Sequence, residues 1–129
     1  MGFPAEPVIF FKATTSIVGP TDDVLIPKTG SKLDWEVELA VVMGARANGG
    51  QPGAGARSRA GYVLHNDYSE RVSQLERGGQ WVKGKSADTF APLGPFRRRA
   101  TRFPIRGQLR ACGCSVNGTA APGQHRRPT

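Results

Sequence analysis

The alternation of apolar and polar residues is clearest in the segment WEVELAVVM, residues 35–43. Its odd-numbered residues are all apolar, while Glu36 and Glu38 open the opposite face. Because successive side chains of a strand point to opposite faces, this period of two predicts a β-strand. A Gly-rich connection over residues 44–59 leads to AGYVLHND, residues 60–67, which predicts a second, more apolar strand. We expect the two strands to pair.

The segments on either side of these strands carry weaker patterns. EPVIFFKA, residues 6–13, is apolar on both faces except for Lys12 near its end, and it predicts another strand. DYSERVSQLERGG, residues 67–79, predicts a helix of about three turns that ends at its two glycines. Asp67 and Glu70 stand in capping-box spacing at the start of this helix. The proline-containing segment that follows is expected to be an extended loop.

Charge is distributed unevenly along the 129-residue chain, whose formal net charge is +8. All ten acidic residues lie between Glu6 and Asp88, whereas residues 97–129 hold eight arginines and no acid. An acid-free stretch rich in Arg, Gly, Pro and Ala is what a frame shift in GC-rich coding DNA would yield. We therefore expect this tail to be disordered or aberrant, and the chain to form one domain at most.

The composition also bears on where the protein is found. No stretch approaches the roughly 18 apolar residues of a membrane span, and the N-terminus lacks the basic-then-apolar order of a signal peptide. Cys112 and Cys114 are separated by one residue, where a mutual disulfide would be strained, so we expect free thiols in a reducing compartment. These features predict a cytoplasmic protein without membrane contact.

The segment GGQWVKGKS, residues 78–86, satisfies the letter pattern of a phosphate-binding P-loop. A P-loop leaves a strand and enters a helix, so that backbone N–H groups converge on the phosphates. Here a predicted helix precedes Gly79, bulky Trp81 and Val82 occupy the loop, and prolines prevent a long helix afterwards. The context therefore argues against nucleotide binding, and Lys85 requires another explanation.

The acidic face of the first strand offers different chemistry. Glu36 and Glu38 point the same way with Cα atoms about 6.6 Å apart, so their carboxylates could converge on one hard divalent cation, with Asp67 as a third ligand. Two other interpretations stay open. Paired glutamates are often the solvent face of a strand, although Ala40 and Val42 continue this face and favour burial. Asp67 alone could be a helix N-cap.

Three collinear blocks together resemble the catalytic domain of the fumarylacetoacetate hydrolase family, truncated at both ends. They are PVIFFKATTSIVGPTDDVLIP with LDWEVELAVVMG, then AGYVLHNDYSERVSQLE, then QWVKGKSADTFAPLGPF. The resemblance covers residues 7–96 and implies a partial catalytic domain over residues 1–96, followed by the tail. It also implies an α+β, mostly β fold: an incomplete fumarylacetoacetate hydrolase-like β-roll with one short helix after the second metal-ligand strand.

The resemblance further implies a site. A Mg²⁺ or Mn²⁺ ion is held by carboxylates that match Glu36, Glu38 and Asp67. Lys85 matches an active-site lysine, and Arg71 and Gln74 match polar positions near the substrate. Family members hydrolyse, isomerise or decarboxylate small 2-oxo acids such as acylpyruvates and dienoic 2-oxo diacids, as in aromatic catabolism, and intact members form homo-oligomers, typically dimers. A Lewis-acidic metal polarises the oxo group and stabilises an enolate, while Lys85 can hold developing negative charge.

One departure from the family pattern keeps an alternative open. The family's general-base histidine lies upstream of the segment that matches Pro7, and neither His65 nor His125 is assigned its role; a lone His on an apolar strand is more often a core residue. The chain could instead be a non-catalytic fragment or pseudoenzyme whose basic tail binds nucleic acid or another polyanion. Nucleic acid is the less favoured partner, because Phe103 is the tail's single aromatic residue available for base stacking.

Overall fold

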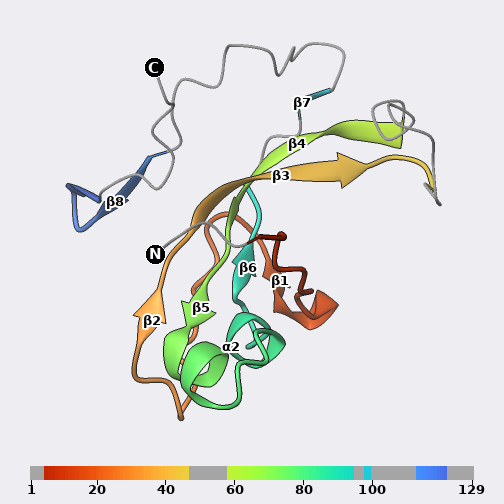
Figure 1. Ribbon diagram of the computed structural model, residues 1–129. Helices are drawn as coiled ribbons and strands as arrows, with labels where there is room; N and C mark the ends of the chain where they lie inside the picture. Colours follow the sequence, from red (N-terminus) through yellow and green to blue (C-terminus); the bar gives the residue numbers. More distant parts are fainter. Residues whose placement is uncertain (1–4, 47–57, 95–97, 100–112, 122–129) are drawn as a thin grey trace. The chain divides into compact units, whose positions relative to one another are not determined.

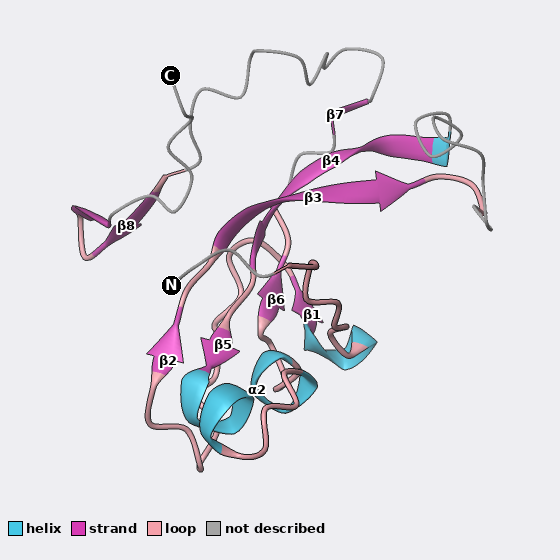
Figure 2. Cartoon of the chain, in the orientation of Figure 1, coloured by secondary structure: helices cyan, strands magenta, loops and turns pink. Residues whose placement is uncertain are grey.

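The computed structural model describes residues 5–46, 58–94, 98–99 and 113–121. In this part of the chain, strands outnumber a few short helical turns, as Figure 2 shows, in agreement with the predicted α+β, mostly β class. The chain forms two compact units. The first comprises Met1–Trp35 and Asp67–Pro92, and the second comprises Glu36–Asn66 and Leu93–Thr129.

The second unit is built on the hairpin of β3 (Val37–Met43) and β4 (Arg59–Asn66), which confirms the two predicted strands and their pairing (Figure 1). They run antiparallel, with Val37 opposite Asn66 at one end and an irregularity in register after Val42 at the other. A short strand, β7 (Arg98–Arg99), pairs with β4. Val37, Tyr62 and Val63 are the buried apolar residues of this hairpin.

A second hairpin in this unit joins β8 (Cys114–Val116) to β9 (Thr119–Ala121). The turn consists of Asn117 and Gly118, both with positive φ, at 51° and 77°. Consecutive left-handed residues are what a two-residue hairpin loop requires, and Asn-Gly adopts them readily. The segment SVNG, residues 115–118, thus supplies part of β8 and the turn. Cys114 is a free thiol, and Cys112 lies outside the described residues.

The first unit contains two small sheets and three helical turns. Strand β1 (Ile17–Val18) pairs in parallel with β6 (Ala91–Pro92), and β2 (Leu33–Asp34) pairs antiparallel with β5 (Ser69–Glu70). Phe90, which is fully buried, and Ala91 form the apolar part of its core. The elements are η1 (Thr14–Ser16), β1 (Ile17–Val18), β2 (Leu33–Asp34), β5 (Ser69–Glu70), η2 (Val72–Glu76), α2 (Val82–Lys85) and β6 (Ala91–Pro92).

Two predicted elements are wrong. Residues 6–13 form no strand, and Ile9, which is 93% exposed, lies in an irregular segment. The predicted helix over residues 67–79 is reduced to the five-residue π-helix η2, because the backbone of Ser69 and Glu70 pairs with β2. The predicted glycine stop does occur, since Gly78 and Gly79 both have positive φ.

The structure also bears on membrane contact. Among the described residues, no helix is long and apolar enough to cross a membrane. The helical segments there have three to five residues, whereas a membrane-spanning helix needs about 20.

Candidate functional site

Asp67 lies between two lysine ammonium groups in the first unit. It is 2% exposed, and its Oδ1 accepts a hydrogen bond from Lys12 Nζ at 2.6 Å while its Oδ2 accepts one from Lys85 Nζ at 2.7 Å. Lys12 also donates to the carbonyl oxygen of Tyr68 at 3.1 Å. The alternative role of Asp67 as a helix N-cap is therefore wrong, because its carboxylate binds lysines and β5 follows it instead of a helix.

Lys85 is the last residue of α2 and is 1% exposed. Besides its ion pair with Asp67, its Nζ lies 5.0 Å from the ring centroid of Phe10 and 5.9 Å from that of Trp81. An ammonium over aromatic faces gains cation–π stabilisation, which helps to offset its removal from water. The lysine stands at the C-terminal end of its helix, so the local structure differs from a P-loop, as predicted.

Lys12 was not among the predicted site residues. The signal was nevertheless present in the sequence, because Lys12 interrupts the apolar run VIFFKA. A lysine among large apolar residues is rarely buried without a charged partner. What the sequence could not supply was the partner, since Asp67 lies 55 residues further along the chain.

Glu36 and Glu38 belong to the second unit, at the start of the β3–β4 hairpin. Both side chains are half-buried, which is intermediate between the exposed and the buried positions that the sequence left open. The backbone N–H of Glu36 donates to Asn66 Oδ1 at 3.0 Å, and Val37, the residue between the two glutamates, is opposite Asn66. Asp67 directly follows Asn66 in the chain. The pairing of β3 with β4 thus places Glu36 and Glu38 beside Asn66, the residue that directly precedes Asp67.

Arg71 and Gln74, the two predicted substrate-binding residues of the helical segment, contact each other. Arg71 Nη1 donates to Gln74 Oε1 at 2.7 Å, and Gln74 is buried. On its other edge the guanidinium donates from Nε and Nη2 to Asp34 Oδ2, at 3.0 and 2.6 Å. Asp34 was not predicted, because its link to Arg71 spans 37 residues.

Glu70 ties the loop before β2 to the start of η2. Its Oε1 accepts from the backbone N–H groups of Ser31, Lys32 and Val72 at 3.3, 3.1 and 3.4 Å, and its Oε2 accepts from that of Ser73 at 2.7 Å. Burial raises the pKa of Glu70, but the hydrogen bonds from Ser73, Lys32 and Ser31 outweigh it and lower the pKa to about 2. Glu70 thus supplies the helix start that Asp67 was expected to cap.

This carboxylate predicts a loss of stability in acid. Because the folded pKa of Glu70 is about 2 and its ordinary value is 4.5, its stabilising contribution is fully present above pH 4.5. We expect it to be lost as the pH falls from about 4.5 to about 2. Urea unfolding across this range checks the expectation: the fall in stability should be smaller in Glu70→Gln, and an equal fall in both proteins would contradict it.

His65 has a backbone role in the structure. Its position in β4 is opposite Glu38, and it forms an isolated bridge with Leu93. Its side chain is half-buried. His125 lies outside the described residues.

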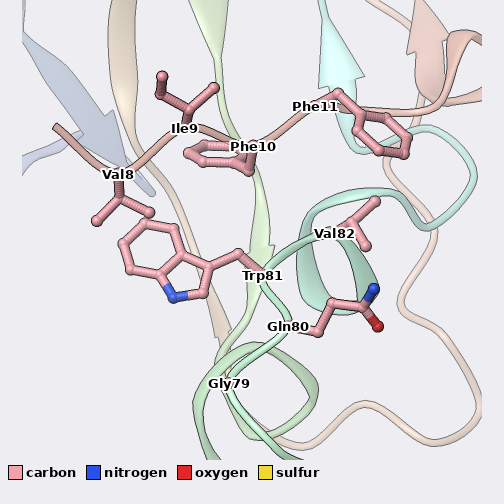
Figure 3. Close-up of a pocket in the computed structure, with 8 residues that line it drawn as sticks. All are labelled: Val8, Ile9, Phe10, Phe11, Gly79, Gln80, Trp81 and Val82. Atoms are coloured by element: carbon pink, nitrogen blue, oxygen red, sulfur yellow. The ribbon is translucent and has the colours of Figure 1, made fainter.

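The first unit contains a cavity of about 330 Å³. It is lined by residues 8–11 and residues 79–82, whose side chains are drawn in Figure 3. Phe10 and Trp81 belong to its wall, with ring centroids 5.4 Å apart, and the same two rings lie near Lys85 Nζ. Side chains in the lining are apolar except for Gln80, so this cavity offers no carboxylate to a metal ion. The lining residues are Val8, Ile9, Phe10, Phe11, Gly79, Gln80, Trp81 and Val82.

Comparisons with known proteins agree on one family. Over 96 residues the chain is 53% identical to a protein of Burkholderia cenocepacia (strain HI2424) that carries the general name of a hydrolase; the match covers 74% of this chain and 34% of that protein. Among solved structures, it is similar to a fumarylacetoacetate hydrolase from the psychrophilic Exiguobacterium antarcticum, with a TM-score of 0.78 and 33% identity, covering 88% of this chain and 40% of that one.

A second solved structure is 5-carboxymethyl-2-hydroxymuconate delta-isomerase from Mycobacterium smegmatis, with a TM-score of 0.76 and 33% identity, covering 91% of this chain and 45% of that one. The chain spans about a third of the length of the curated relatives that it matches. The family model described as the C-terminal domain of fumarylacetoacetate (FAA) hydrolase matches residues 1–124. The chain therefore belongs to the fumarylacetoacetate hydrolase family.

Proposed function

We propose that Glu36, Glu38 and Asp67 bind one divalent cation, Mg²⁺ or Mn²⁺, and that the chain acts on small 2-oxo acids there. The observation that carries the proposal is the pairing of Val37 with Asn66, since it puts two glutamates beside the residue before Asp67. Each of these three acids offers carboxylate oxygens to such an ion. Carboxylate oxygens are the ligands that hard divalent cations prefer.

The donor set and its charges fit such an ion. Each carboxylate oxygen of Asp67 accepts one hydrogen bond from a lysine ammonium group. Because an ionised carboxylate has about four lone-pair sites, each oxygen keeps a lone pair with which it can bind a metal ion. Asp67 with Lys12 and Lys85 carries one net positive charge, and the two glutamates carry two negative charges. A divalent cation brings the sum to +1, which complements a 2-oxo carboxylate anion.

The remaining predicted residues have roles suited to this substrate class. When bound, the cation supplies Lewis-acid polarisation of a 2-oxo group. Lys85, buried beside Asp67, offers a fixed positive charge to an oxygen that gains negative charge. Arg71 presents a planar guanidinium, which suits a substrate carboxylate, and Gln74 orients it through their hydrogen bond. A relative named fumarylacetoacetate hydrolase and another named 5-carboxymethyl-2-hydroxymuconate delta-isomerase support hydrolysis or isomerisation of small organic acids.

The experiment is a titration of the chain with Mn²⁺, with and without oxalate as a 2-oxo acid analogue. We expect oxalate to bind only when Mn²⁺ is present. Glu38→Ala should weaken Mn²⁺ binding by about 100-fold, because removing one of three carboxylates is comparable to the loss of a charge-assisted contact of about 2–3 kcal/mol.

The matched control is Glu6→Ala, which removes an exposed glutamate of the same chain. It should bind Mn²⁺ and oxalate as the wild type does. Oxalate binding without metal, or unchanged Mn²⁺ affinity in Glu38→Ala, would defeat the proposed site.

The ligand class, the oligomeric state and the cellular compartment are proposed from the family match. We infer that the partner is a small-molecule 2-oxo carboxylate, that the chain assembles as a homodimer, and that it works in the cytoplasm. Sedimentation analysis of the purified chain tests the assembly: a dimer is expected, and a monomer at all concentrations would contradict it.

A further inference from the structure

We propose that Glu70 is a positioning residue that holds Arg71 and Gln74 in the geometry needed for binding a 2-oxo acid; this rests on the proposed function. Glu70 is 2% exposed, and its carboxylate accepts four backbone N–H groups. A buried carboxylate with this number of donors is fixed in place, because each oxygen is committed to specific backbone groups.

The four donors come from two segments far apart in sequence. Ser31 and Lys32 precede β2, whereas Val72 and Ser73 open η2. One side chain therefore holds the N-terminal end of η2 against the loop before β2. The backbone N–H of Arg71 adds a further link, since it donates to the carbonyl oxygen of Lys32 at 2.9 Å.

Arg71 depends on both of these segments. Its guanidinium donates to Asp34, which ends β2, and to Gln74, which lies in η2. If the two segments separate or slide, the guanidinium cannot keep both partners at 2.6 to 3.0 Å. Glu70 thus controls the direction of Arg71 without contacting the substrate itself.

Glu70→Gln tests this role with little change in size. Glutamine replaces one acceptor oxygen with an NH₂ donor, which cannot accept the N–H groups that converge there. We expect the Kd for oxalate in the presence of saturating Mn²⁺ to rise about 10-fold, equivalent to about 1.4 kcal/mol. The Kd for Mn²⁺ alone should stay within about twofold, because Glu70 is no ligand of the ion.

Glu76→Gln is the matched control. Glu76 is the last residue of η2. It is exposed, and it forms a surface ion pair with Lys32 Nζ at 2.5 Å. Exposed ion pairs contribute little, so oxalate binding by Glu76→Gln should equal that of the wild type. An equal loss in Glu76→Gln and Glu70→Gln would overturn the assignment to Glu70.

A double-mutant cycle separates positioning from general support of the fold. If Glu70 acts through Arg71, Glu70→Gln should change the oxalate Kd by less than about twofold in an Arg71→Ala background. A loss as large as in the wild-type background, or wild-type oxalate binding by Glu70→Gln itself, overturns the inference.

Two further outcomes are distinguishable. If circular dichroism shows that Glu70→Gln is unfolded, Glu70→Asp takes its place, because aspartate keeps the charge but has a shorter side chain. An oxalate Kd that rises at least about threefold with unchanged Mn²⁺ affinity supports the inference, and an unchanged oxalate Kd overturns it. If the wild-type chain binds no oxalate with Mn²⁺, the proposed function fails and the role of Glu70 fails with it.

Discussion

Replacing Asp67 with asparagine is expected to lower the free energy of unfolding by about 3–5 kcal/mol. The carboxylate is buried and binds the ammonium groups of Lys12 and Lys85 at 2.6 and 2.7 Å. Asparagine keeps the shape but loses the charge, and its NH₂ group then faces one of the ammonium groups. Buried positive charge without compensation is costly, because the low-dielectric interior replaces hydration poorly. Urea unfolding measures the loss.

Two variants sharpen this test. Asp23→Asn removes an exposed carboxylate of the same unit and should leave stability within about 0.5 kcal/mol. Adding Lys85→Met to Asp67→Asn should recover part of the lost stability, since it removes one of the two buried charges. Wild-type stability in Asp67→Asn, or no recovery in the double variant, would show that the buried ion pair is not the cause.

Gly84→Ala is expected to destabilise the chain by about 2–3 kcal/mol, because α2 packs closely on the segment that holds the polar site residues. A Cβ at this position would lie 2.6 Å from Gln74 Cβ and 2.7 Å from Gln74 N, and would also clash with the backbone carbonyl oxygen of Glu70. Two of these three atoms belong to the backbone, so relief requires a movement of β5 or η2. The shift in the urea midpoint reports the loss.

The matched control is Gly113→Ala, where a Cβ would meet nothing within 4 Å. Its stability should equal that of the wild type within about 0.5 kcal/mol. A neutral Gly84→Ala would mean that α2 is not held against Gln74 as closely as the structure shows. If the methyl group of alanine at position 84 is tolerated, η2 is also less tightly constrained than its contact with α2 indicates.

The sequence predicted the elements that depend on local patterns. Alternation over residues 35–43 gave β3, and the apolar run after the Gly-rich connection gave β4. The segments that failed depend on distant partners. Ser69 and Glu70 have helix-compatible spacing to their neighbours, yet they pair with Leu33 and Asp34, more than 30 residues away, and that pairing overrides local preference.

The same distinction applies to the candidate site. The six predicted residues could be chosen because their types and spacing match a known family. The groups that hold them could not, because Lys12, Asp34 and the backbone donors to Glu70 come from elsewhere in the chain. These partners are tertiary contacts between residues far apart in the chain, and spacing along the sequence does not predict them.

The most direct test of the proposed metal site is an anomalous difference map from a crystal of the chain soaked in Mn²⁺. We expect one peak, about 2.0–2.6 Å from carboxylate oxygens of Glu36, Glu38 and Asp67. A saturated crystal with no peak at these residues, or with Mn²⁺ bound only elsewhere, would contradict it.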